Sequence, residues 1–324
     1  MRFPSVTVHV TVKNSESTIK SCIDSLLRLN YPNKKIVVTD AFSTDSTYDI
    51  LKTYGHKISL EQVKGFAPHA HNHILQKVNT EFYAVTDADC TVDRNWLRNL
   101  ISAFKSKDVI AAGGIVKTPK NVNKLQDLIG RELENRYHHF PKIVSRFPTM
   151  SMIVRTSVAK KVKMNENLQV AFETDWGFKL EKFGKLVYVP SAVVWHYHRG
   201  SLTSFFKQQM NYAKFTPQVY TRHIEKTKGD YISTPLMFAQ EFLFLTFSIL
   251  FFLTLFTSVF SNNQPPSFLS RITFFSFVLL LLPSYLIDAI PLSRNAIDVI
   301  LYQCLFFIRN IAWTVGLIRS VFGK

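Results

Sequence analysis

Cysteine is scarce in this chain. The 324 residues contain only three, Cys22, Cys90 and Cys304, and these are far apart in the sequence. Such spacing excludes a disulfide framework and a structural zinc site, so we expect a reducing compartment. The amino terminus also lacks the long apolar segment of a secretory signal peptide, because MRFPSVTVHVTV passes directly into strand-like alternation.

Charged residues are rare after residue 235. Only three of the 23 acids and five of the 39 Lys and Arg lie there, so the first 235 residues carry most of the net charge of +16. A strongly basic surface attracts nucleic acid, anionic lipid head groups or phosphorylated substrates. No helix-turn-helix or RNA-binding signature is evident, so we expect no nucleic-acid partner and favour a surface that faces a membrane.

Long apolar segments fill the carboxyl-terminal part. Residues 236–260 and residues 272–292 each carry one charge and are long enough to cross the hydrocarbon core. In residues 295–322 the polar side chains share one helix sector, which favours an amphipathic interfacial helix somewhat over a third span. We therefore expect a catalytic domain of residues 1–235 and a membrane domain of residues 236–324. The flanking cations predict a cytoplasmic catalytic domain on a plasma or ER-type membrane.

The first half of the chain alternates between two kinds of hydrophobic pattern. Strands are expected at residues 5–12, 34–40, 56–63, 82–89 and 108–116, and helices at residues 17–29, 43–54, 69–78 and 96–105. This order predicts a mostly parallel, doubly wound α/β sheet, in which ligands bind at the carboxyl ends of the strands. Asp40 and Asp87 both fall at such ends.

Two carboxylates, Asp87 and Asp89, lie one residue apart where an apolar run ends. If that run is a strand, both carboxylates point to one side and Ala88 points to the other. Two hard oxygen donors suit Mg²⁺ or Mn²⁺, which also bind substrate phosphates. The tripeptide alone is more often only a turn, so its surroundings decide the interpretation.

Further polar groups follow other expected elements. Asp45 stands where it can cap a helix, and Glu173 and Asp175 precede a second helix. A His196-Tyr-His198-Arg199 run follows a later strand. Taken alone, the two acids also suit a helix amino terminus, and each histidine also suits a core position.

Taken in order, these pieces resemble a family-2 glycosyltransferase of the GT-A fold with a carboxyl-terminal membrane anchor. The resemblance extends from about residue 5 to residue 215 and rests on short motifs. They are Lys13-Asn14-Ser15-Glu16, Asp40-Ala-Phe-Ser-Thr-Asp45, Asn72, Asp87-Ala-Asp89, Gly113-Gly114, Glu173-Thr-Asp175-Trp176, Val189-Pro190, His196-Tyr-His198-Arg199 and Gln208-x-x-Asn211-Tyr212.

The resemblance implies a site for a UDP- or GDP-sugar and a divalent cation. The implied nucleotide-sugar contacts are Thr11, Lys13, Asn14, Glu16, Asp40, Asn72, Asp87, Ala88, Asp89 and Arg199. The implied ligands of Mg²⁺ or Mn²⁺ are Asp87, Asp89 and His196. Asp40 would accept a hydrogen bond from the nucleobase, and the cation would spread the charge of the leaving diphosphate.

The resemblance also implies a general base near Glu173, with Asp175 as its competitor. The base would take a proton from an acceptor hydroxyl during an inverting displacement. Two departures stand out. The family's Pro-Thr-Tyr-Asn-Glu opening is reduced in residues 11–16, which leaves the nucleotide contacts there open. Gln208-x-x-Asn211-Tyr212 lacks the Arg of processive synthases, so we expect one sugar to be added per encounter.

The expected function is metal-dependent transfer of a sugar to a lipid-linked acceptor, such as a polyprenyl phosphate or a polyprenyl diphosphate glycan. Residues 117–150 are expected to shape the acceptor side. Two alternatives remain open. One is a polyprenyl-phosphate sugar synthase, which needs no base. The other is a membrane scaffold that keeps the fold without activity.

Overall fold

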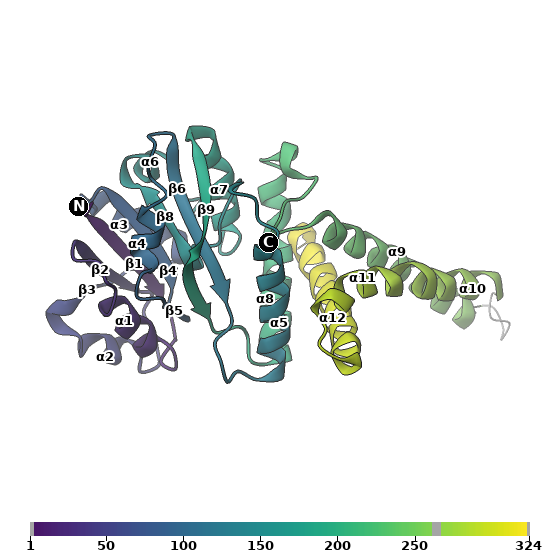
Figure 1. The fold of residues 1–324 in the computed structure, drawn as a ribbon. Helices are drawn as coiled ribbons and strands as arrows, with labels where there is room; N and C mark the ends of the chain where they lie inside the picture. The colour runs from purple at the N-terminus through teal and green to yellow at the C-terminus, as the bar shows by residue number, and fades with distance from the viewer. Residues whose placement is uncertain (1–2, 261–266, 323–324) are drawn as a thin grey trace. The chain divides into compact units, whose positions relative to one another are not determined.

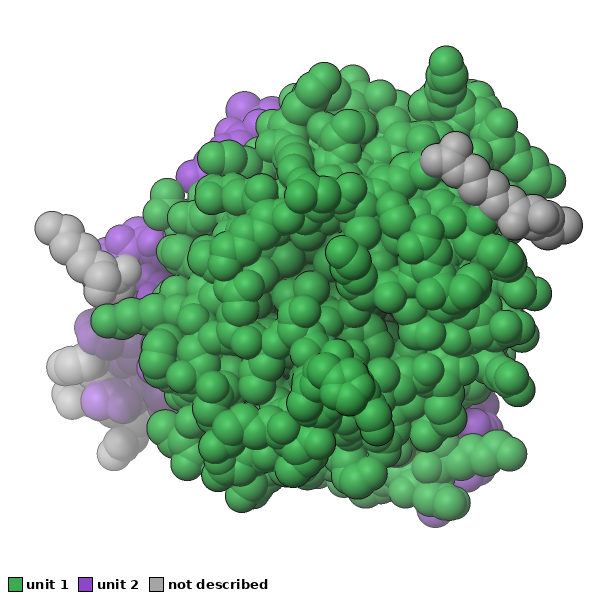
Figure 2. Space-filling model, turned by 90° about the vertical axis from the view of Figure 1, so that its left-hand side faces the viewer, with its two compact units in different colours: residues 1–200 green, residues 201–324 purple. Residues whose placement is uncertain are grey.

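The structure is a computed structural model that describes residues 3–260 and residues 267–322 (Figure 1). The chain forms two compact units, Met1–Gly200 and Ser201–Lys324, which Figure 2 colours separately. The first contains an α/β sheet, and the described part of the second is helical. The functional domains expected at residues 1–235 and residues 236–324 stay a prediction.

A single nine-stranded sheet organises the first unit. Its order is β3-β2-β1-β4-β8-β6-β9-β5, and β7 pairs with β9. The strands are β1 (Val6–Val12), β2 (Lys34–Asp40), β3 (Ser59–Gln62), β4 (Phe82–Asp87), β5 (Cys90–Val92), β6 (Val109–Lys117), β7 (Ile143–Val144), β8 (Met152–Arg155) and β9 (Lys185–His196). All but β5, β7 and β8 run in one direction. The mostly parallel sheet predicted from the sequence is therefore confirmed.

Helices connect these strands and form the second unit. In the first unit they are α1 (Ile19–Leu27), α2 (Thr47–Lys52), α3 (Ala67–Lys77), α4 (Trp96–Ile101), α5 (Lys124–His138), α6 (Thr156–Lys161) and α7 (Phe172–Leu180), with short helical turns η1 (Gly55–Lys57), η2 (Thr149–Ser151) and η3 (Glu181–Phe183). In the second unit they are α8 (Leu202–Tyr220), η4 (Ile224–Lys226), α9 (Pro235–Phe260), α10 (Ser267–Ser276), the π-helical turn η5 (Phe277–Leu281), α11 (Leu282–Leu292) and α12 (Ala296–Phe322).

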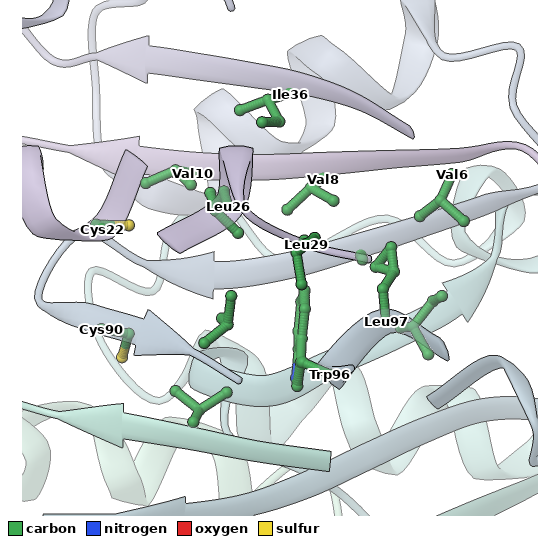
Figure 3. Packing of buried hydrophobic residues seen from close by; sticks show 14 of the residues in the cluster. Val6, Val8, Val10, Cys22, Leu26, Leu29, Ile36, Cys90, Trp96 and Leu97 are labelled. Atoms are coloured by element: carbon green, nitrogen blue, oxygen red, sulfur yellow. The ribbon is translucent and has the colours of Figure 1, made fainter. Parts of the chain in front are cut away.

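The core forms because β1 is covered on both faces. Val6, Val8 and Val10 lie on one face and pack with α1 and α4, including Leu26 and Trp96 (Figure 3). The alternate residues of β1 point to the opposite face, which α3 covers. A strand buried on both faces holds its carboxyl end rigidly, and that end belongs to the candidate site.

The second face of β1 contains a buried polar cluster. One ring nitrogen of His9, Nδ1, lies 3.1 Å from Nδ1 of His71 and also contacts the Tyr83 hydroxyl. The other, Nε2, lies 2.9 Å from the Thr39 hydroxyl. Burial lowers the pKa of both histidines, so both are neutral in the folded protein.

Three helices of the second unit are long and apolar enough to cross a membrane: Pro235–Val259, Phe268–Leu292 and Ala296–Phe322. The first two correspond to the spans predicted from the sequence. The third, α12, packs along α8, where Trp313 Nε1 donates to Gln209 Oε1 at 2.9 Å. Most of its polar sector is buried, including Asp298, Arg309 and Asn310. Within it, Arg309 donates to Oε1 of Gln240 at 2.7 Å. This sector is therefore a packing surface within the unit.

Candidate active site

Three strand ends form the floor of the candidate site. β1 pairs with β2 in the register Val12↔Asp40, and with β4 in the register Thr11↔Asp87. All three strands are parallel, so their carboxyl ends meet at one edge of the sheet, where such sheets bind ligands. The sequence predicted that Asp40 and Asp87 lie at strand ends, and the strand bounds agree.

Antiparallel pairing then brings His196 to the aspartates. The chain turns after Asp87, and β5 pairs with β9 in the register Cys90↔His196. The backbone N–H of Tyr197 also donates to the carbonyl of Asp89 at 2.9 Å. As a result, Nε2 of His196 lies 3.3 Å from Oδ1 of Asp89, residues that are far apart in the sequence.

The two carboxylates differ in their electrostatics. Burial and the charge of Asp89 raise the pKa of Asp87, whose Oδ1 accepts a hydrogen bond from the Thr149 hydroxyl at 3.0 Å. Burial also pushes the pKa of Asp89 upward, but His196 and Arg199 outweigh it and lower that pKa overall. Burial alone would lower the pKa of His196, but the two aspartates raise it above its usual value. Without a cation, Asp89 and His196 therefore form a charged pair, and a divalent cation would bind His196 by displacing its proton.

The donor set fits a divalent cation. Asp89, Cys90 and His196 each present one ligand atom, and these atoms lie within 4.8 Å of one another. Carboxylate oxygens and an imidazole nitrogen suit Mg²⁺ or, better, Mn²⁺. Burial raises the pKa of Cys90 well above its usual range, so its protonated thiol is a poor ligand for such ions. Asp87, Asp89 and His196 remain the predicted ligands.

The two candidate bases occupy different environments in the first turn of α7. Glu173 is half-buried, and burial raises its pKa while the charge of Arg146 opposes that effect. Its charge in turn acts on Asp87, so it belongs to the same electrostatic cluster. Asp175 is fully buried and forms a 2.6 Å ion pair with Lys179 one turn further along the helix. Glu173 is therefore the better-placed candidate.

The loop after β1 is tied to the loop after β2. The backbone N–H of Thr44 donates to Oδ1 of Asn14 at 2.8 Å, and the N–H of Ser46 donates to Oε2 of Glu16 at 3.0 Å. Asn14 and Phe42 adopt left-handed backbone conformations, with φ of 50° and 55°. Such strained residues concentrate at ligand sites. Lys13, Asn14 and Glu16 are exposed at this edge, and Thr11 is half-buried.

Asp45 supports the start of α2 from one residue before its N-cap, which is Ser46. Its Oδ1 accepts a hydrogen bond from the N–H of Thr47 at 3.0 Å, at the first residue of α2. Its Oδ2 accepts another from the N–H of Glu16 at 3.2 Å. Asp45 therefore joins the two loops and starts the helix.

Two predicted nucleotide contacts, Asp40 and Asn72, already have protein partners. Asp40 is buried, and its Oδ2 accepts hydrogen bonds from the N–H of Ser43 at 3.1 Å and from Nε2 of Gln62 at 3.0 Å. The Asn72 amide donates to the carbonyl of Met164 at 2.9 Å. Both side chains fix the loops around the site, and their contacts to a nucleotide sugar stay predictions.

The segment after His196 contacts the region expected to shape the acceptor side. Nδ1 of His196 lies 3.1 Å from Nδ1 of His198, and burial with the charge of His196 lowers the pKa of His198 to about 3. Gln126 in the first turn of α5 donates to the carbonyl of His198 at 2.8 Å. Arg199 is exposed, and Ala88 is buried beside the aspartates.

Sequence reasoning missed three residues that support this site. Thr149 donates to Asp87, Gln62 donates to Asp40, and Arg146 acts on Glu173. Gln62 stands opposite Asp40 in the β2–β3 register, which requires knowledge of the strand pairing. We find no local sequence signal for Thr149 or Arg146.

A mostly parallel sheet with carboxylates at its strand ends is compatible with a transferase of activated sugars, but a fold alone does not decide function. Comparison with known proteins gives the same class. The profile of Glycosyl transferase family 2 matches residues 7–168, which is half of the chain. The chain belongs to this family and is a glycosyltransferase.

Individual relatives are distant. The chain is 22% identical over 275 residues to dolichyl N-acetyl-alpha-D-glucosaminyl phosphate 3-beta-D-2,3-diacetamido-2,3-dideoxy-beta-D-glucuronosyltransferase of Methanococcus voltae, covering 76% of this chain and 81% of that protein. It is 24% identical to poly-beta-1,6-N-acetyl-D-glucosamine synthase of Staphylococcus epidermidis, covering 64% of this chain and 54% of that protein.

One solved structure shares the fold over the whole chain. It is the mannosyltransferase PcManGT from Pyrobaculum calidifontis in complex with GDP-Man and Mn²⁺. The TM-score is 0.63 at 16% identity, and the match covers 100% of this chain and 89% of that one. At this identity the likeness shows the fold alone.

Proposed function

We propose that this protein is a membrane-anchored, metal-dependent inverting glycosyltransferase. It transfers one sugar per encounter from a nucleoside diphosphate sugar to a lipid-linked acceptor at the cytoplasmic face. The observation that carries the proposal is the pairing of Asp89 with His196 at the carboxyl edge of the sheet, where the charges of these two residues and of Glu173 act on Asp87. The three long apolar helices support the anchor.

The chemistry follows from these side chains. Asp87, Asp89 and His196 would hold the divalent cation, which when bound neutralises charge on the leaving diphosphate. Glu173 would take the proton of an acceptor hydroxyl while that oxygen bonds to the anomeric carbon. The bond from the anomeric carbon to the diphosphate breaks, and its electron pair leaves with the phosphate oxygen. A single displacement of this kind inverts the anomeric centre.

Two observations support a lipid-linked acceptor. The Methanococcus relative is named for a dolichyl-linked sugar phosphate and covers most of both chains. The basic first 235 residues of this chain precede its apolar helices, which suits anionic lipid head groups. The absence of Arg from Gln208-x-x-Asn211-Tyr212 in α8 supports one addition per encounter.

Changing Glu173→Gln tests the type of acceptor. If the acceptor is a hydroxyl, loss of the base lowers turnover on the order of a hundredfold or more. If it is a polyprenyl phosphate, which is already ionised, turnover stays nearly unchanged and the protein is a polyprenyl-phosphate sugar synthase. Lys182→Gln is a control just after the same helix, because it changes an exposed charge outside the proposed chemistry.

Nucleotide binding tests whether the protein is an enzyme at all. Calorimetry with UDP and with GDP, each with and without Mn²⁺, should give metal-dependent binding of one of them. Binding of neither nucleotide in the presence of metal would favour an inactive scaffold and contradict the proposal.

A further inference from the structure

One buried cation near the cluster is not explained by donor or metal binding. Arg146 lies in the segment between β7 and η2, and only 5% of it is exposed. Burying an arginine is costly, so its position calls for specific contacts that repay the lost hydration. Several of its contacts lie on α7, and its charge also acts on Tyr137 of α5.

Arg146 contacts α7 at three positions. Its Nη1 donates to the hydroxyl of Thr174 at 2.8 Å, and its guanidinium lies 5.7 Å from the centre of the Phe178 ring. Between these two residues, Gly177 lets the helix approach the Arg146 backbone. A Cβ at Gly177 would lie 2.8 Å from the Arg146 Cα, which is closer than real Cβ atoms come. Arg146 is thus packed against the helix with side chain and backbone alike.

The start of α7 is strained and requires such support. Ala171, the residue before the helix, has a left-handed backbone with φ of 61°. This conformation is unfavourable for an L-residue other than glycine. Its carbonyl accepts the N–H groups of Thr174 at 3.1 Å and of Asp175 at 3.2 Å, which closes the first turn around Glu173. A strained turn keeps one geometry only where neighbouring groups hold it.

We propose that Arg146 is a positioning residue that holds the first turn of α7 and thereby fixes the carboxylate of Glu173 beside the aspartate cluster. The inference rests on the proposed function, in which Glu173 is the base. In this role Arg146 acts through Glu173. It donates a hydrogen bond to Thr174, the residue next to Glu173. A change at Arg146 should therefore alter the position of the Glu173 carboxylate.

The same arginine also sets the charge around Glu173. From β4, the negative Asp87 interacts with Glu173, and Arg146 provides the opposing positive charge. On α7 itself, Asp175 and Lys179 pair with each other at 2.6 Å. A positive neighbour favours the ionised carboxylate, so removing Arg146 raises the pKa of Glu173. The acid limb of activity then moves to higher pH, which loss of stability alone does not produce.

The test compares Arg146→Met, Arg146→Lys and Thr174→Val in the full chain purified in detergent. For Arg146→Met we expect kcat to fall on the order of ten- to a hundredfold, with little change in KM for the nucleotide sugar. The acid limb of kcat/KM should move up by roughly half a pH unit or more. Arg146→Lys should return the acid limb of kcat/KM to its wild-type pH and recover part of kcat. Thr174→Val should lower kcat and leave the limb in place.

Arg155→Met is the matched control. Arg155 is also packed on an aromatic ring, 5.4 Å from the centre of Phe82, and donates to the carbonyl of Val109 at 2.9 Å. It lies on β8, away from α7, so its loss should lower the melting temperature without moving the acid limb. Circular dichroism supplies the folded fraction for every variant.

Failure of the inference can be distinguished from failure of the proposed function. If the wild type transfers sugar and Arg146→Met keeps its kcat and acid limb after correction for folded protein, Arg146 is not a positioning residue. The same holds if Arg146→Met and Arg155→Met behave alike. If the wild type itself transfers no sugar from any donor, the proposed function fails, and this inference fails with it.

Discussion

At the residue scale, the charge state of Asp87 depends on Thr149, which is far from it in the sequence. The hydroxyl of Thr149 donates to Oδ1 of Asp87 at 3.0 Å. A hydrogen bond to a carboxylate favours the ionised form, so this contact opposes the burial that raises the pKa of Asp87. Thr149 thereby favours the ionised form of a predicted metal ligand near neutral pH.

Changing Thr149→Val should weaken metal binding in a pH-dependent manner. Without the hydroxyl the pKa of Asp87 rises further, so protons compete with the cation over a wider range of pH. We expect Mn²⁺ affinity to fall on the order of tenfold at pH 6.5, and less at pH 8. Titration of Mn²⁺ at both pH values measures this. An equal loss at the two values would contradict the electrostatic role of Thr149.

Much of the candidate site is visible in the sequence, but its supporting residues are not. Asp87, Asp89 and Glu173 stand out because acids that follow apolar runs or precede helices are recognisable patterns. The partnership of Asp89 with His196 depends on the β5–β9 register, and β5 has only three residues. Arg146 falls in an irregular segment, where periodicity carries no information.

At the element scale, the close packing of α8 and α12 depends on a glycine. A Cβ at Gly316 would lie 2.3 Å from the carbonyl oxygen of Met210 and 2.7 Å from Cβ of Ala213. Small residues of this kind let helices in membrane proteins approach each other closely. The two helices therefore cannot stay this close together if residue 316 has a bulky side chain.

Changing Gly316→Leu should separate these helices and destabilise the second unit. Overpacking a tight contact typically costs about 1–3 kcal/mol, so the melting temperature in detergent should fall clearly. Gly200→Ala is the control, since the nearest atom to its added Cβ would lie 3.4 Å away. An unchanged melting temperature for Gly316→Leu would show that α8 and α12 do not pack at this point.

The elements themselves were predictable to different degrees. The five strands expected in the first half are all present. Four of them are six to nine residues long and contain apolar runs, whereas β3 has four residues with the sequence SLEQ. The short strands β5, β7 and β8 have two to four residues each and exist through their pairing with longer strands. The polar sector of α12 was visible, but its partner Gln240 on α9 was not.

At the scale of the whole molecule, buried histidines make the fold sensitive to acid. Burial lowers the pKa of His71 to about 3 and that of His9 well below its usual value. In the unfolded chain both return to about 6.5. As the pH falls below that value, the unfolded chain binds protons that the folded chain excludes, and stability is lost.

We therefore expect the urea concentration at half unfolding to decrease when the pH is lowered from 8 to 5. The free energy of unfolding should drop by up to about 1.4 kcal/mol per pH unit for each histidine. Replacement of His71→Gln removes one of the two groups, so this variant should show a shallower dependence on pH. A midpoint that is equal at pH 8 and pH 5 in the wild type would contradict neutral, buried histidines.

The proposed function depends on metal-assisted sugar transfer to a lipid at the Asp89–His196 pair. The most direct measurement supplies radiolabelled UDP- and GDP-sugars, Mn²⁺ and membrane lipid extract to the full chain in vesicles. Label should enter the organic-solvent phase with the wild type. It should be lost on chelation and in Asp89→Asn, but kept in Asp108→Asn, a surface acid paired with Lys185. Lipid labelling that survives both chelation and Asp89→Asn, or no labelling with any of the UDP- or GDP-sugars, would contradict the proposed function.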